Sequence, residues 1–416
     1  LASQSTLINI VRAEVESAGR NVLVLSAGDV NTGVPESDLF DAEPDFTLMN
    51  MIGYDAMTLG NHEFDNSPDV LMKQKGIATF PFLAANVIKK GSEELLVKPY
   101  IVKNIDGLNV AILGLVTKDV PKLVLPENVK HLEFLDVIAT ANTYVPALKN
   151  QADLLIALTH IGLSRSGPGD IGDVQLAEAV PGIDVIVGGH THTNLEEPVV
   201  VGNTLIVQAD AYSEKVGRLN ITVDSDTNSV TAYNYELLPV NGKERIRYNE
   251  KDYYQYVGTG FVEDREILAA MEGYLEGAEE LLQKTVGTAV VELVGGKSVS
   301  RCQETNLGNL ITDAMRDKTK ADIALMNGGS IRAGIAPGTI TYRDVLTVQP
   351  FGNTLTTIMM TGTQIMEVLD ATATKVCRGG FMQVSGLQVT YSQATGKAEK
   401  VMVGNAPIGL EKTYKV

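Results

Sequence analysis

Four residues of metal-binding types stand at separate points of the chain, each just after an apolar run. They are Asp29 after 22–25, Asn61 after 55–59, His160 after 154–158 and His190 after 183–187. Such Val, Ile and Leu runs predict strands buried on both faces of a layered α/β domain, and ligands collect at the carboxyl edge of these strands. A two-metal site needs mixed oxygen and nitrogen ligands and one bridging carboxylate. The pattern therefore predicts that the fold brings the four together, with Asp29 as the bridging residue.

Taken one at a time, these residues have ordinary explanations. A lone histidine at a strand end is more often a satisfied polar residue than a ligand, and a lone aspartate there is commonly a helix N-cap. The chain contains five histidines, and four of them fall in the motifs: His62, His160, His190 and His192. This concentration favours a metal site over a set of unrelated residues.

Length and charge limit the classes of function. A chain of 416 residues exceeds the roughly 250–300 residues at which one core stops growing, which predicts two domains. A net charge of −17 argues against a nucleic-acid polymer as partner, whereas bound cations and a few arginines still permit a small phosphorylated substrate.

No apolar stretch approaches the roughly 18–20 residues of a membrane span. Cys302 and Cys377 lack the Cys-x-x-Cys spacing of a thiolate zinc site, and their spacing leaves open whether they pair.

The hydrophobic pattern divides the chain into three parts. Residues 1–250 alternate apolar runs with amphipathic stretches, which is typical of an α/β domain, and contain a hairpin over 217–238. Residues 251–284 are interpreted as a linker, with a long helix over 264–284 after the polar stretch 241–252. Residues 285–416 form the second domain. Helices are expected over 6–15, 137–149, 306–318 and 362–375, and strands over 109–116, 323–326, 354–360 and 387–391.

The order of the motifs resembles a known family. Gly28-Asp29, Gly60-Asn61-His62-Glu63, Thr159-His160 and Gly189-His190-Thr191-His192 resemble the calcineurin-like metallophosphoesterases. Segments 29–37, 41–46 and 53–57 resemble more narrowly the bacterial periplasmic 5′-nucleotidase/UDP-sugar hydrolase family, and 304–310, 327–332 and 349–353 resemble its substrate-binding domain. The resemblance spans nearly the whole chain. It implies an N-terminal four-layer αββα metallophosphoesterase domain, a linker helix and a C-terminal α+β substrate-binding domain.

The same resemblance implies which residues bind metal. It implies two divalent ions, with Asp29, Asn61, His160 and His190 on one ion. His192 would join Asp29 on the other, at a position that close relatives fill with glutamine or asparagine. Imidazole suits zinc, whereas aspartate and asparagine also accept manganese or magnesium, so the choice among the three metals stays open. Hydrolysis would proceed by in-line attack on phosphorus by a hydroxide held on metal.

His62 and Asp65 are expected to act as a catalytic pair, as the corresponding residues do in the family. Asp65 lies three residues after His62, one turn on if a helix opens here, so its carboxylate can orient the imidazole ring. An imidazolium held in this way stabilises charge on the phosphoryl oxygens and assists the leaving oxygen. The alternative is that Asp65 only caps the helix.

In the second domain the resemblance implies a nucleotide-binding set. Phe351 would stack on the base, although core packing explains it at least as well from the sequence alone. Arginine suits the polar groups of the substrate because of its bidentate fork. The implied set is Arg301, Asn327, Gly329, Arg332, Phe351 and Asn353.

Both ends of the chain depart from the family pattern. In the family an Asp-x-His segment lies upstream of the position of Leu1, and a Gly-Gly-Asp-Gly loop and a second base-stacking aromatic lie beyond that of Val416. The second domain is therefore expected to be incomplete. A polypeptide of residues 1–416 alone is expected to bind one metal at most and to turn over nucleotides poorly.

The predicted function is dimetal-dependent hydrolysis of 5′-nucleotides to nucleoside and phosphate, which in the resembled family extends to UDP-sugars. Two alternatives stay open. One is a 2′,3′-cyclic nucleotide phosphodiesterase/3′-nucleotidase, and the other is a non-catalytic nucleotide-binding protein if the upstream segment is truly absent. The resemblance implies a periplasmic or secreted protein whose partner is a small nucleotide, and we expect a monomer without a membrane span.

Overall fold

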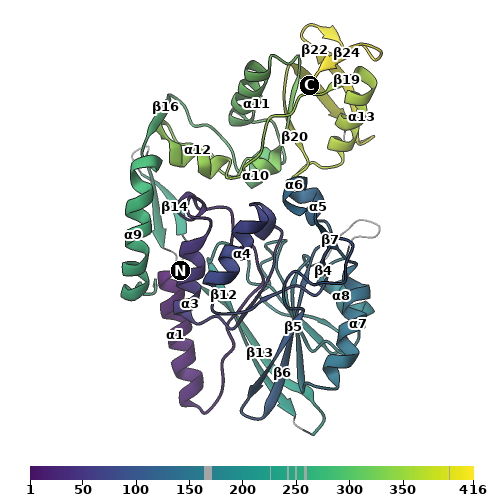
Figure 1. Ribbon diagram of the computed structural model, residues 1–416. Coiled ribbons are helices and arrows are strands. Elements are labelled where there is room, and N and C mark those ends of the chain that lie inside the picture. The colour runs from purple at the N-terminus through teal and green to yellow at the C-terminus, as the bar shows by residue number, and fades with distance from the viewer. Residues whose placement is uncertain (164–170, 225, 241–242, 249–250, 257–259, 393) are drawn as a thin grey trace. The chain divides into compact units, whose positions relative to one another are not determined.

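The computed structural model describes residues 1–163, 171–224, 226–240, 243–248, 251–256, 260–392 and 394–416 (Figure 1). The chain divides into two compact units. The first comprises residues 1–32 and 39–275, and the second comprises residues 33–38 and 276–416. Each unit combines helices with strands, so the predicted two-part α/β architecture is confirmed.

A six-stranded sheet forms the centre of the first unit. Its strands lie in the order β10-β11-β9-β8-β6-β5, in which β6, β8, β9 and β11 run parallel and the two edge strands run antiparallel to their neighbours. The strands are β5 (Tyr100–Ile105), β6 (Leu108–Val116), β8 (Leu154–His160), β9 (Val185–Val187), β10 (Val199–Val201) and β11 (Thr204–Val207). Every residue of β8 is buried, as expected for a central strand of a layered domain.

A smaller parallel sheet, in the order β1-β2-β3, carries the first two motifs. Its strands are β1 (Leu25–Ser26), β2 (Ala56–Thr58) and β3 (Phe82–Leu83). Asp29 and Asn61 follow the carboxyl ends of β1 and β2. His160 is the last residue of β8, and His190 follows β9. The four residues therefore stand at the carboxyl ends of four strands from two sheets, as the sequence predicts.

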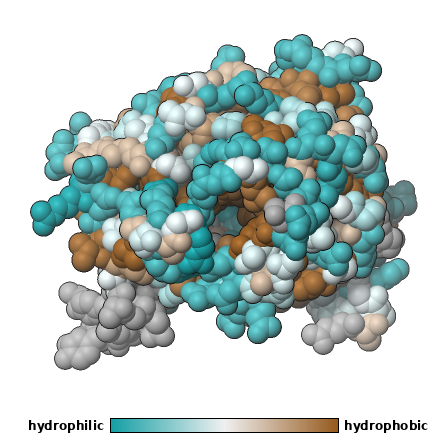
Figure 2. Space-filling view, turned by 90° about the horizontal axis from the view of Figure 1, so that it is seen from below, coloured by the Kyte–Doolittle hydropathy of each residue, from teal (hydrophilic) through white to brown (hydrophobic). Residues whose placement is uncertain are grey.

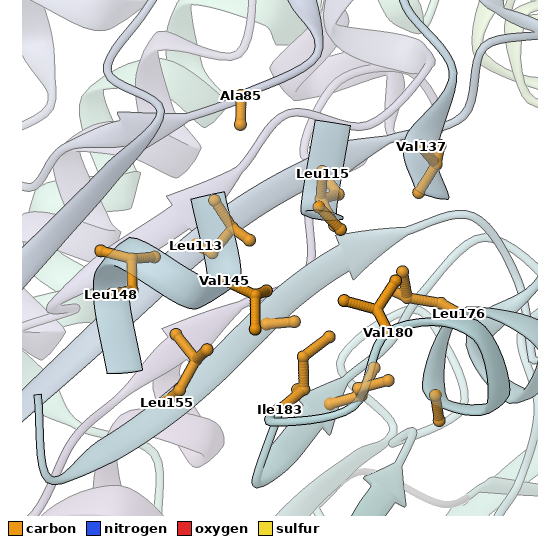
Figure 3. Packing of buried hydrophobic residues seen from close by; sticks show 14 of the residues in the cluster. Ala85, Leu113, Leu115, Val137, Val145, Leu148, Leu155, Leu176, Val180 and Ile183 are labelled. Carbon is orange, nitrogen blue, oxygen red and sulfur yellow. The ribbon is translucent and has the colours of Figure 1, made fainter. Parts of the chain in front are cut away.

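Three apolar clusters lie between four layers. The first lies between the two sheets and joins Ala56 and Leu83 to Ile112, Ile156 and Leu158. The second packs α3 (Glu43–Ile52) and α4 (Pro68–Ile77) on the other face of the small sheet. The third packs α7 (Val137–Lys149) and α8 (Asp173–Ala179) on the other face of the large sheet, and its members include Leu113, Leu115, Val145, Leu148, Leu155, Leu176, Val180 and Ile183 (Figure 3). This arrangement is the expected αββα sandwich.

Further elements complete the first unit. They are α1 (Ala2–Ser17), η1 (His62–Phe64), β4 (Val87–Lys89), α5 (Val120–Leu123), α6 (Pro126–Val129), β7 (Leu132–Phe134), β12 (Lys215–Asp224), β13 (Ser229–Pro239), β14 (Lys243–Tyr248) and β15 (Lys251–Tyr256). β12 and β13 form the predicted hairpin. β14 and β15 form a second hairpin, which the sequence analysis did not predict for the polar stretch 241–252.

The long helix α9 (Arg265–Leu282) is confirmed, and the two units divide inside it, after Leu275. The predicted boundary after residue 250 falls on residues outside the described ranges. The boundaries at 250 and 284 stay predictions.

The second unit is built around two smaller apolar clusters. One joins Ile323, Ile365, Leu369 and Tyr414, and the other joins Leu307 and Ile331 among others. Its helices are α2 (Pro35–Asp38), α10 (Lys297–Ser300), α11 (Asn306–Thr319), η2 (Gly328–Ser330), α12 (Tyr342–Val348) and α13 (Gly362–Ala373). Its strands are β16 (Thr285–Ala289), β17 (Ala324–Asn327), β18 (Gly338–Thr341), β19 (Met359–Thr361), β20 (Met382–Ser385), β21 (Leu387–Ser392), β22 (Lys397–Val403), β23 (Ala406–Pro407) and β24 (Thr413–Lys415).

Local signals account for most of these elements. The predicted helix over 137–149 matches α7, whose N-cap Asp136 accepts a hydrogen bond from the backbone of Ala139 at 3.1 Å. α11 begins after the N-cap Thr305, whose side chain accepts from the Gly308 N–H. The expected strand over 354–360 was wrong for most of its length, because regular pairing begins only at Met359.

Cys302 and Cys377 form a disulfide, which decides the question that their spacing left open.

One face of the molecule is mostly hydrophilic. Figure 2 shows a face on which hydrophilic side chains predominate and hydrophobic ones form separate patches. Among the helices of the described residues, none is long and apolar enough to cross a bilayer.

Candidate metal centre and active site

Asp29 stands in a tight turn that follows β1. Its backbone is left-handed, with φ 60°, which is uncommon outside glycine and typical of functional sites. The turn packs closely on the loop after β2, since a Cβ on Gly60 would lie 2.2 Å from Oδ1 of Asp29. Glycine at position 60 is therefore required for the two strand-end loops to meet.

Glu63 joins these two loops through hydrogen bonds to their backbones. Its carboxylate accepts backbone hydrogen bonds from Gly60 at 2.6 Å, Asp29 at 2.9 Å and Val30 at 2.8 Å, with a longer one from Asn31 at 3.3 Å. The residue is 1% exposed. Burial and the neighbouring Asp29 raise the pKa of Glu63, while the backbone N–H groups favour its charged form. Glu63 therefore fixes the position of Asp29 without being a ligand candidate itself.

His160 meets Asp29 across the two sheets. Its Nδ1 lies 2.6 Å from the carbonyl oxygen of Ala27, which can only accept a hydrogen bond, so Nδ1 carries the proton. Its Nε2 lies 2.9 Å from Oδ2 of Asp29. Burial opposes the charged form of His160, but the Asp29 carboxylate outweighs it and raises the pKa of the ring. In turn, His160 and His62 outweigh burial and hold the pKa of Asp29 well below its usual range.

His190 completes a group of three candidate ligands. One ligand atom from each of Asp29, His160 and His190 lies within 4.8 Å of the others. The His190 and His160 rings meet edge to face, with centroids 5.1 Å apart. The His190 backbone is left-handed, with φ 77°, as is that of Asp29. The protein thus holds both residues in costly conformations at the same point.

The donor set fits a divalent cation. The Oδ1 atom of Asn61 is buried and has no hydrogen-bond partner among the described residues, whereas buried polar atoms are normally paired. Two ligands at about 2.1 Å from one ion lie about 3.0–3.4 Å apart, close to the distance between His160 Nε2 and Asp29 Oδ2. Without a proton or a cation between them, these two acceptor atoms would repel each other. Imidazole, carboxylate and amide groups are ligands of zinc, manganese and magnesium.

His62 and Asp65 form the predicted pair. His62 Nδ1 lies 2.6 Å from Oδ2 of Asp65, which also accepts a hydrogen bond from the Thr32 hydroxyl at 2.7 Å. The His62 backbone N–H donates to Oδ1 of Asp29 at 2.8 Å, and its Nε2 lies 3.9 Å from Oδ2 of Asp29. Burial opposes the charged ring, but the Asp29 and Asp65 carboxylates prevail and raise the pKa of His62 to about 9.

His192 lies two residues after His190 in the chain. It is not one of the three residues whose ligand atoms converge, and its ring packs edge to face on Tyr212, with centroids 5.3 Å apart. Its backbone is left-handed, with φ 53°. The structure brings Asp29, His160 and His190 to one place, and the Asn61 loop joins Asp29 through the neighbouring His62 N–H. The assignments of Asn61 to the same ion and of His192 to a second ion stay predictions.

The second unit brings three of the six predicted nucleotide-binding residues, Arg301, Asn327 and Gly329, close to Gly379. The Gly379 carbonyl accepts from the Gly329 N–H at 2.9 Å and from Asn327 Nδ2 at 3.4 Å. A Cβ on Gly379 would lie 3.9 Å from the guanidinium carbon of Arg301. The guanidinium carbon of Arg332 lies 5.6 Å from the centre of the Phe351 ring, in the range of a cation–π contact. Asn353 is exposed two residues further on.

Sequence reasoning missed the role of two groups in these sites. Glu63 was visible as the last residue of the Gly-Asn-His-Glu motif, but its four backbone partners come from two loops that only the fold brings together. Gly379 carries no side chain that would signal a binding role. Its glycine pair with Gly380 is the only local sign that the backbone comes close to another segment.

Comparison with known proteins agrees with this geometry. Residues 2–194 match the family model of the calcineurin-like phosphoesterases, and residues 285–416 match that of the 5′-nucleotidase C-terminal domain. A 5′-nucleotidase of Vibrio vulnificus is 40% identical over 100% of this chain and 79% of its own length. The chain belongs to the 5′-nucleotidase family.

Two further relatives match this member of the 5′-nucleotidase family over nearly the whole of its chain. Protein UshA of Escherichia coli is 36% identical over 100% of this chain and 80% of its own. The crystal structure of a 5′-nucleotidase precursor from Thermus thermophilus superposes with a TM-score of 0.83 at 32% identity, covering 99% of this chain and 82% of that one. The chain is therefore a metallophosphoesterase, and calcineurin-like phosphoesterases use divalent metals.

Proposed function

We propose that the protein releases inorganic phosphate from nucleoside 5′-monophosphates at a centre of two divalent ions. Asp29, Asn61, His160 and His190 would hold one ion, and Asp29 with His192 would contribute to the other. The second unit would bind the nucleoside. The resemblance to proteins named 5′-nucleotidase over the whole chain supports this choice of substrate.

One observation carries the proposal. A partly buried carboxylate and two imidazoles converge at the strand ends of two sheets, and a neighbouring loop carries a buried amide oxygen without a described partner. Polar and charged groups are costly to bury without a hydrogen-bond partner, and a bound cation would offset this cost. A core of ordinary polar contacts would instead pair the Asn61 oxygen with a donor.

The chain's own residues would act around the bound ions. When present, divalent ions supply a water whose pKa falls toward about 7 and neutralise phosphoryl charge. Asp65 fixes the tautomer and direction of the His62 ring through the 2.6 Å contact at Nδ1. Nε2 of His62 is then left to donate a proton to the phosphoryl or leaving-group oxygen, which stabilises the charge that develops in the transition state.

The second unit would select the nucleoside. Phe351 offers a face for stacking on the base, worth about 1–3 kcal/mol. Arg301, Arg332, Asn327 and Asn353 offer donors to the ribose and base, and the Gly329 backbone lets the Asn327 turn come close to them. The Arg332 guanidinium over Phe351 supports this arrangement, because the cation orders the ring from one side.

Phosphate release from AMP tests the proposal. The protein should lose activity after exhaustive chelation and regain it with zinc, manganese or magnesium, and the best of the three identifies the metal. UDP-glucose measures the nucleotide-sugar branch, and 2′,3′-cyclic AMP measures the phosphodiesterase alternative. Hydrolysis of 2′,3′-cyclic AMP without hydrolysis of AMP would favour the phosphodiesterase alternative over the proposed reaction. Adenosine binding without any turnover would favour a non-catalytic nucleotide-binding protein.

We place the protein in the periplasm or outside the cell. The Cys302–Cys377 disulfide supports this location, since such bonds persist in oxidising compartments and are rare in the cytosol. Fractionation of cells that express the full-length gene would test it, and recovery with cytosolic markers would contradict it.

A further inference from the structure

We infer that the Cys302–Cys377 disulfide positions the nucleoside-binding residues of the second unit and thereby sets the affinity for the nucleoside. The inference rests on the proposed function, in which the Arg301 and Asn327 segments contact the nucleoside. It concerns two cysteines to which neither the motifs nor the catalytic geometry gives a role.

The disulfide joins two segments that are distant in the chain. Cys302 lies just after α10 and next to Arg301, while Cys377 lies in the connection between α13 and β20, 75 residues further on. A backbone hydrogen bond runs beside the covalent bond, from the Cys377 N–H to the Arg301 carbonyl at 2.7 Å. The Arg301 carbonyl and the residue that follows it are therefore both attached to this connection.

The clamped connection is also the partner of the Asn327 turn. Two residues after Cys377, the Gly379 carbonyl accepts from both the Gly329 N–H and the Asn327 side chain. The Arg301 segment reaches the same turn directly, since a Cβ on Gly328 would lie 2.1 Å from the Ser300 carbonyl oxygen. Two segments with predicted binding residues, the Arg301 segment and the Asn327 turn, therefore meet the Gly379 connection, and the disulfide ties the Arg301 segment to that connection.

The conformation that the disulfide holds is costly on its own. Cys377 has a left-handed backbone, with φ 61°, in an exposed connection. A non-glycine residue in this region costs about 1–3 kcal/mol and persists only when its surroundings hold it. Once the covalent bond is broken, the connection can relax, and Gly379 then moves away from Arg301 and from the Asn327 turn.

Relaxation of this connection does not require the unit to unfold. One of the two apolar clusters of this unit is built from residues such as Ile323, Ile365 and Leu369, which lie outside the connection. The first unit, with Asp29, His160 and His62, contains neither cysteine. Loss of the disulfide should therefore weaken binding of the nucleoside and leave the phosphoester chemistry intact.

The double substitution Cys302→Ser with Cys377→Ser tests the inference. Calorimetry with adenosine and metal-free protein should show a Kd about tenfold higher than that of the wild type, the effect of weakening one charged hydrogen bond. With metal present, the KM for AMP should rise by a similar factor while kcat changes by less than about twofold. Hydrolysis of p-nitrophenyl phosphate, which has no base or ribose, should not change.

Two controls separate positioning from general destabilisation. Val401→Ala removes buried apolar volume from the same unit, away from the clamp, and should lower its melting temperature without changing the affinity for adenosine. If the double variant does not fold, wild-type protein in dithiothreitol serves instead. The reagent reduces the S–S bond to two thiols and becomes its own cyclic disulfide, and adenosine binding is measured without metal.

The outcomes are distinct. Unchanged adenosine affinity after the disulfide is broken, or an equal loss of rate on AMP and p-nitrophenyl phosphate, would overturn the inference. Failure of the wild-type protein to hydrolyse AMP with any of the metals would instead count against the proposed function.

Discussion

Nε2 of His160 lies 2.9 Å from Oδ2 of Asp29, although one residue ends a strand of the large sheet and the other follows a strand of the small one. The Ala27 carbonyl fixes the proton on Nδ1 of the ring, so the lone pair of Nε2 faces the carboxylate. This pairing of two acceptors is stable only with a positive charge beside it. A metal ion bound there would supply this charge.

The two histidines of the Gly-His-Thr-His motif should differ. His190→Ala should lower the affinity for the metal ion that Asp29, His160 and His190 would share by more than about 100-fold. The substitution removes a ligand itself and not merely a group that supports a ligand. His192→Ala should leave that ion in place, since its ring packs on Tyr212 outside the group of three. Metal titration of both variants measures the difference. Equal retention of metal by both would show that His190 is not a ligand.

His62→Asn should lower kcat by about 10²–10⁴-fold with unchanged metal content, since the ring transfers a proton and is not a ligand. Asp65→Asn should have a milder effect, because Thr32 still holds the side chain in place. His131→Asn is the matched control, since His131 is exposed and lies outside the motifs. Steady-state kinetics combined with metal analysis decides the matter, and loss of metal in the His62 variant would assign it a different role.

Glu63→Gln should weaken metal binding without touching a ligand. The amide group would turn a donor toward backbone N–H groups, and we expect a cost of about 1–3 kcal/mol in unfolding free energy. Metal affinity should fall about 10–100-fold, as for other groups that support ligands. Glu127→Gln, at an exposed glutamate, should change neither quantity. Wild-type metal affinity in the Glu63 variant would mean that Asp29 holds its position unaided.

Asp173 should make the stability of the protein depend on pH. Burial raises the pKa of its carboxyl group from 3.8 to about 7, against the hydrogen bond from Thr159 and the charge of His160. The folded state therefore favours the protonated form, and this contribution to stability is complete below pH 3.8 and is lost as the pH rises through about 7. Asp173→Asn should raise the melting temperature more at pH 8 than at pH 5. The exposed Asp69→Asn serves as the control, and a gap that is the same at both pH values would contradict the prediction.

The sequence contained the information for the strands and for the ligand candidates. Apolar runs mark buried strands whatever their partners, and Asp29, His160 and His190 follow from residue type and position at the strand ends. The same holds for α7 and α11, whose N-caps Asp136 and Thr305 precede amphipathic segments.

The contacts between distant segments were not available from the sequence. The four backbone bonds of Glu63 depend on how closely two loops pack, and the pairing of Cys302 with Cys377 depends on a distance set by the whole second unit. The hairpin of β14 and β15 was missed because its polar residues lack the alternating apolar pattern that marks a half-buried strand. The segment before Met359 looked like a strand by composition, but within the described residues only Ile358 is paired there, by two backbone hydrogen bonds with Val416.

Anomalous diffraction from crystals grown with manganese or zinc tests whether these residues bind a metal ion. We predict a peak about 2.0–2.2 Å from Oδ1 of Asn61, a carboxylate oxygen of Asp29, Nε2 of His160 and a ring nitrogen of His190. Crystals of the Asn61→Ala variant, grown in the same way, should show a weaker peak at the same place. A crystal that hydrolyses AMP but shows no peak among these four residues would show that they do not bind the catalytic metal.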